Sequence, residues 1–105
     1  MVNPYAGEVA VVIDGTSQVA KLTLGALAEL EANLETGSLM ELIERIEARR
    51  FSARDVLAIL VAGLRGAGWQ GTVGDLSRAE FGGGPLGAAK VAALLLARAF
   101  SLPEE

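Results

Sequence analysis

The sequence predicts an α+β fold that is mainly α, with an N-terminal β-hairpin followed by a compact bundle of four to five helices. Apolar residues alternate along residues 8–24, on both sides of an Asp-Gly pair, which is typical of a hairpin. Beyond that point they recur every three or four positions, which is typical of helices. A chain of 105 residues predicts one domain, covering residues 1–105.

The hairpin is expected at about residues 8–24. Asp14 and Gly15 provide the turn, because glycine adopts positive φ without steric cost. The second strand is expected from Val19 to Leu24, with Leu22 and Leu24 on one face. An isolated hairpin is marginal in water, so this one must pack against the helices.

Two amphipathic helices are expected next, at about residues 24–36 and 38–50. Leu27, Leu30 and Leu34 share one side of the first, and Gly37 is a suitable residue to follow its end. Ser38 and Glu41 have the spacing of a capping box that opens the second. Arg49–Arg50 would occupy its last turn, where cations favour the helix dipole.

A third helix is expected at about 52–65 and a short fourth at about 72–81. Ser52 caps the third, with Asp55 at the third helical position, and its apolar residues leave only a narrow polar edge. We therefore expect this helix near the centre of the core. Thr72 and Asp75 can start the fourth helix in the same way.

The last helix is expected at about 85–102, with Pro85 as its first residue. Its apolar arc is wider than the roughly 100° that packing on one neighbour requires. Either this helix is central to the bundle, or part of it faces another protein chain. Residues 86–102 are too short and carry Lys90 and Arg98, so a membrane span is not expected.

The charges are segregated along the chain, whose net charge is −4. Residues 29–47 hold six Glu and one Arg, whereas residues 49–98 hold seven basic and three acidic residues. These stretches could be solvated faces balanced within one monomer, or complementary patches that orient subunits. The acidic balance argues against nucleic acid as a partner.

Composition leaves little room for catalysis. The chain has no His and no Cys, which excludes catalytic triads built on them and the usual zinc ligands. Glu41, Glu44 and Glu47 lie one turn apart, but on the wet side of a helix where a raised pKa is not expected. We expect no enzyme, no cofactor and no metal. The beginning of the chain has no basic start or apolar run, so cytoplasmic localisation is expected.

The apolar fraction of 51% and mean hydropathy of +0.41 are high for a small soluble chain, and they point to protein–protein contact. Trp69 could fill the base of the core or anchor a partner. Arg54 and Arg65 share one edge of the third helix and could hold an acidic partner, or pair with local carboxylates. The candidate partner-binding residues are Val91, Leu94, Leu95, Arg98, Leu102, Trp69, Arg54 and Arg65.

Four stretches resemble the tail protein family of bacterial gene transfer agents and related prophages, which is grouped with phage tail assembly chaperones. They are residues 7–15, residues 22–31, residues 51–56 leading into 62–66, and residues 95–100. Their order and spacing carry the resemblance. The family has also been labelled as tail tube protein.

The resemblance implies a tail assembly chaperone that binds the tape-measure protein, assists tail tube assembly and is absent from the mature particle. The tape-measure and tail tube proteins would then be its partners. One alternative is a structural, tube-associated tail protein retained in the particle. Another is a small helical regulatory module that acts by dimerisation through the last helix, so a homo-oligomer is also possible.

Overall fold

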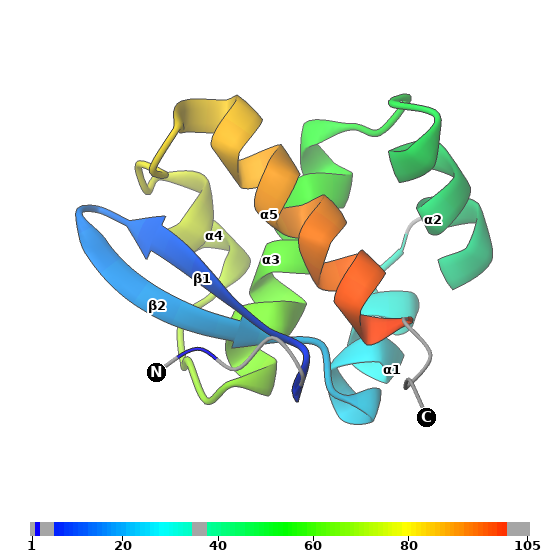
Figure 1. The fold of residues 1–105 in the computed structure, drawn as a ribbon, viewed down its shortest axis with the longest axis horizontal. Coiled ribbons are helices and arrows are strands. Elements are labelled where there is room, and N and C mark those ends of the chain that lie inside the picture. Colours follow the sequence, from blue (N-terminus) through cyan, green and yellow to red (C-terminus); the bar gives the residue numbers. More distant parts are fainter. Residues whose placement is uncertain (1, 3–5, 35–37, 101–105) are drawn as a thin grey trace.

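The computed structural model describes residue 2, residues 6–34 and residues 38–100, and these form an antiparallel hairpin packed against helices (Figure 1). The elements are β1 (Glu8–Ile13), β2 (Thr16–Lys21), α1 (Leu24–Ala32), α2 (Leu39–Glu47), α3 (Ala53–Gly66), α4 (Val73–Ser77) and α5 (Gly84–Ala99). The expected α+β, mainly α, fold is confirmed. No helix in these ranges is both long and apolar enough to cross a bilayer.

The hairpin turns at Asp14 and Gly15, which both have positive φ, of 50° and 80°. Ile13 pairs with Thr16 across this tight turn, as the Asp-Gly pair predicted. The expected second strand was placed too late, since β2 starts at Thr16 and ends at Lys21. Leu24 is not on the buried face with Leu22, because Thr23 caps α1 and Leu24 becomes its 84% exposed first residue.

Helix α3 lies at the centre of the molecule, between the hairpin, α1 and α5 (Figure 1). Its residues from Ile59 to Leu64 are all buried, which confirms the expected central position. Two glycines let neighbours come close. Leu95 of α5 packs on Gly63, and a Cβ at position 63 would lie 2.9 Å from the Cδ1 atom of Leu95. The carbonyl of Lys21 packs directly on Gly66.

Several helices end earlier than the sequence predicted. Helix α2 stops at Glu47 because Arg49 adopts a left-handed φ of 57°, so Arg49 and Arg50 follow the helix. Helix α1 ends at Ala32, and the expected stop at Gly37 lies outside the described residues.

Helix α4 ends at Ser77, because residues 80–82 join the edge of β1 instead of continuing the helix. Ile13 bridges Phe81, the Gly82 N–H donates to the Val12 carbonyl (3.0 Å), and the Asp14 N–H donates to the Glu80 carbonyl (2.8 Å). Helix α5 spans Gly84–Ala99 with Pro85 in its first turn, and position 102 lies outside the described residues.

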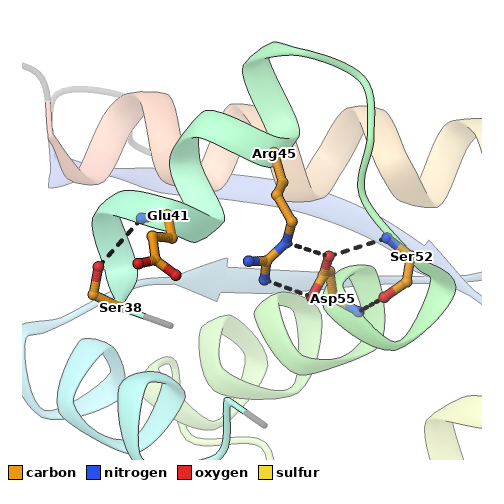
Figure 2. A network of polar contacts seen from close by, with 5 residues as sticks. All are labelled: Ser38, Glu41, Arg45, Ser52 and Asp55. Carbon is orange, nitrogen blue, oxygen red and sulfur yellow. Dashed lines mark hydrogen bonds and ion pairs between the residues drawn. The ribbon is translucent and has the colours of Figure 1, made fainter. Parts of the chain in front are cut away.

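A polar network joins the start of α3 to α2 (Figure 2). Ser52 Oγ accepts a hydrogen bond from the Asp55 N–H (3.0 Å), which confirms the predicted Ser52 cap, and Asp55 Oδ2 accepts one from the Ser52 N–H (3.0 Å), which makes it a capping box. Arg45 of α2 reaches the same carboxylate with two nitrogens, at 3.1 and 3.0 Å. Burial raises the pKa of Asp55, but the bonds from Arg45 and Ser52 outweigh burial and leave the pKa below 3.8.

We expect Gly66→Ala to lower the free energy of unfolding by about 1–3 kcal/mol, because the new methyl group would overlap the Lys21 carbonyl. Gly25→Ala in α1 is the control, since a Cβ there meets nothing closer than 3.9 Å. The control should be neutral or stabilise the protein by up to about 1 kcal/mol. Urea unfolding followed by circular dichroism measures both; equal effects would contradict the close packing of α3 on the hairpin.

We expect Asp55→Asn to lower the free energy of unfolding at neutral pH by about 2 kcal/mol, because it weakens charge-assisted hydrogen bonds. The folded-state pKa lies below the ordinary 3.8, so this stabilisation is present above that value and is lost as pH falls through and below it. The free energy of unfolding of the variant should therefore depend less on pH in this window than that of the unchanged protein.

Asp75→Asn is the matched control for this experiment. Asp75 occupies the same capping position in α4, but within the described part of the chain it forms an ion pair with the exposed Arg78 alone, at 3.9 Å. Its effect on unfolding at neutral pH should be clearly smaller. A loss as large as that of Asp55→Asn would mean that the cap alone, and not Arg45, carries the stabilisation.

Candidate contact surface

An apolar cavity of about 630 Å³ opens where α3 begins, α4 ends and α5 begins. We name it the α3–α4–α5 groove. Its lining residues are Phe51, Ala53, Val56, Leu57, Leu60, Leu76, Ser77, Ala79, Glu80, Phe81, Gly84, Pro85, Ala88 and Ala89. Concave apolar surfaces of this kind serve as contact sites for ligands or partner side chains.

The local sequence explains how the groove is held open. The capping box of Ser52 and Asp55 starts α3 just after Phe51, and Thr72 and Asp75 start α4 in the same way. Gly83, with a left-handed φ of 80°, turns the chain into α5 at Pro85. The starts of α3, α4 and α5 are therefore fixed, and these three helices enclose one apolar space.

The groove offers little chemistry beyond apolar contact. Glu80 is its one carboxylate, and it is exposed. Among residues 2, 6–34 and 38–100, no three of His, Cys, Asp and Glu gather closely enough to hold a metal ion. The arrangement is suited to packing against another protein.

The predicted contact residues of α5 do not share one surface. Leu94 is 39% exposed, Val91 is half-buried, and Leu95 is fully buried against α3. Leu95 is thus a core residue and not an accessible partner contact, because α5 directs it at Gly63. Arg98 donates to the Glu8 carbonyl at the start of β1. Leu102 lies outside the described residues.

The prediction that α5 is central to the bundle is confirmed, and the alternative that part of it faces another protein chain remains a prediction. Its central face is buried through Ala88, Ala92, Leu95 and Leu96. Among the described residues, Leu86 and Leu94 are large apolar side chains of α5 that remain exposed, and so is Phe100, which caps the end of the helix. The helix is therefore a central core element that also carries some apolar surface.

Arg54 and Arg65 both lie on the α1 side of α3. Arg65 pairs with Glu29 of α1 at 3.1 Å, and Arg54 lines a cavity of about 440 Å³ together with Glu29. The Asp55 carboxylate, next to Arg54 in the sequence, is held by Arg45 of α2 at 3.0 Å. Arg65–Glu29 links the acidic and basic stretches within one monomer.

Trp69 is half-buried and packs against the core after α3 ends. Its backbone N–H donates to the Leu64 carbonyl (2.9 Å), and its ring covers Gly71 so closely that a Cβ there would overlap it. These contacts give it a role in the fold of the monomer. Whether it also meets a partner remains a prediction.

The sequence reasoning missed the groove itself. Phe51 precedes the Ser52 cap and Val56 is the fourth helical residue, which is the spacing of a hydrophobic staple. That signal could have placed Phe51 against α3. Phe81 carried no such signal, because its position depends on the bridge to Ile13, far away in the sequence.

A comparison with known families gives one result that covers nearly the whole chain. Residues 6–102 match the family model described as "Phage tail tube protein, GTA-gp10". No curated protein and no solved structure matches the chain. With 105 residues in total, the match spans far more than half of the sequence, and it agrees with the resemblance to gene transfer agent tail proteins. The chain belongs to the GTA-gp10 family of phage tail tube proteins.

Proposed function

We propose that this protein is a structural component of a phage-like tail and is retained in the finished particle. The observation that carries the proposal is the match of residues 6–102 to a family described as a tail tube protein. It favours the structural alternative over the chaperone that the sequence resemblance first implied. The expectation of absence from the particle has no support in that description.

The surface supports a role through protein contact. The α3–α4–α5 groove is apolar, and Leu86, at the start of α5, is 67% exposed. Association of such surfaces with another tail protein would remove them from water, which is favourable in proportion to the area covered. The proposal requires no catalytic group, no cofactor and no nucleic acid.

A tail assembly chaperone that binds the tape-measure protein is the second candidate. One observation favours it: the sheet within the described residues has two strands, whereas a tube subunit usually contributes a more extended sheet to a closed ring. A chaperone would instead use the groove to bind an amphipathic helix of the tape-measure protein.

We expect mass spectrometry of purified particles to recover this chain in a fixed stoichiometry with the other tail proteins. Absence from the particles, together with a soluble complex between this chain and co-expressed tape-measure protein, would instead establish the chaperone. Absence from both would exclude both assignments.

We expect Ala89→Glu to reduce incorporation of the chain into particles by about tenfold or more, because a loss of 1.4 kcal/mol of binding free energy already gives tenfold. Ala89 is half-buried and lines the groove. Ala97→Glu is the matched control, since Ala97 is exposed on the same helix and does not line the groove. Circular dichroism checks that both variants fold; equal incorporation of the two would remove the groove from the contact surface.

A further inference from the structure

The backbone of β2 has a free edge, and the hairpin register shows which residues form it. In an antiparallel ladder, successive residues direct their N–H and C=O groups alternately toward and away from the partner strand. Val12 and Asp14 direct groups away from β2, since they bond to Gly82 and Glu80. Ser17 pairs with Val12, and Val19 pairs with Ala10, so the groups of Ser17 and Val19 point away from β1.

These outward groups are accessible and unpaired within the described residues. Ser17 and Val19 are both exposed, and no other element in residues 6–34 and 38–100 bonds to their N–H or C=O groups. The free edge of β2 is covered at its last residue, because Gly66 of α3 packs on the Lys21 carbonyl. The open stretch is therefore Ser17 to Val19.

The opposite edge of the sheet is occupied on both sides of Ala10. Arg98 donates to the Glu8 carbonyl, and residues 80–82 bond to Val12 and Asp14. Between these contacts, Ala10 is the residue of β1 that directs its backbone groups outward, so the longer open edge within the described residues is that of β2.

The open stretch lacks the features that usually protect an edge. No charge and no proline occurs from Thr16 to Ala20. The outer face of the hairpin also carries two exposed apolar side chains, Val12 at 42% and Val19 at 36%. A two-stranded sheet is marginal alone and gains stability from further strands.

We propose that β2 pairs with β2 of a second copy of this chain, antiparallel and about a twofold axis that passes between the two Gln18 residues. Ser17 of each copy then lies opposite Val19 of the other, and the two pairs exchange four N–H···O=C hydrogen bonds. The result is one continuous four-stranded sheet. This self-association goes beyond the proposed tail function and does not depend on it.

The chemistry of the stretch selects a second copy as the occupant. In this register no charged residue faces a like charge, since Lys21 lies outside the paired residues and Thr16 to Ala20 are neutral. Gln18 faces Gln18, and an amide is both donor and acceptor, so identical side chains can pair. Because the edge of β1 is occupied, the twofold arrangement closes at two copies and does not extend into a fibre.

Size-exclusion chromatography with light scattering over a concentration series tests the proposal on the full chain. The mass should rise from 10.8 kDa to about twice that value and then stop rising. Hydrogen exchange should show the Ser17 and Val19 amides protected at high concentration and unprotected at low concentration. A constant monomer mass, a mass that rises past two copies, or exchange at these amides that does not change with concentration would overturn the proposal.

Val19→Pro is the decisive variant, because it removes an N–H that points away from β1 and so leaves the ladder within the hairpin intact. It should stay monomeric at every concentration, with unchanged circular dichroism. A dimer that survives this change would overturn the proposal.

Val19→Lys is the second variant, in case proline disturbs the fold. It should weaken dimerisation at least tenfold by placing a charge at the edge. Ala10→Lys is its control. Ala10 is exposed on the same face and lies opposite Val19, but it belongs to β1, which is not the strand that pairs with the second copy. The control should retain the dimer; equal loss in both variants would assign the contact to the face of the hairpin and not to its edge.

Discussion

The close approach of α3 to the hairpin and to α5 is the constraint on which the rest of the structure depends. Gly63 and Gly66 remove two side chains from α3, so that Leu95 and the Lys21 carbonyl can lie directly against the helix. A buried row from Ile59 to Leu64 can then contact three neighbouring elements at once. With larger residues at these positions, α5 and the hairpin would be displaced from the same core.

Around this centre, polar side chains fix the helix ends and leave the core apolar. No polar or charged residue is buried in the described ranges. Asp55 illustrates the division of roles, since it caps its own helix and also holds Arg45 of α2. Helix α2 has few contacts with the other elements, and this ion pair ties it to the start of α3. The groove between α3, α4 and α5 depends on the same cap.

The features predicted correctly from the sequence were those that depend on neighbouring residues. The Asp14–Gly15 turn, the Ser52 and Thr72 caps and the central position of α3 follow from local spacing, and all are present. The errors came from distant contacts. Helix α4 stops early because Phe81 bridges Ile13, and Leu95 is buried because Gly63 admits it, which wheel position alone does not reveal. The α3–α4–α5 groove was missed for the same reason, since residues from three separate helices line it.

The contacts along the β1 edge of the hairpin also affect when the hairpin can reach its final structure during synthesis. Residues 8–21 leave the ribosome first, yet Asp14 is bonded to Glu80, 66 positions later, and Glu8 to Arg98, 90 positions later. Closing loops of this length slows folding, because chain entropy is lost before the contacts form. The nascent hairpin therefore lacks these contacts until residue 98 has been translated. In a ribosome-bound chain that ends before residue 80, both edges of the β1–β2 hairpin should be exposed.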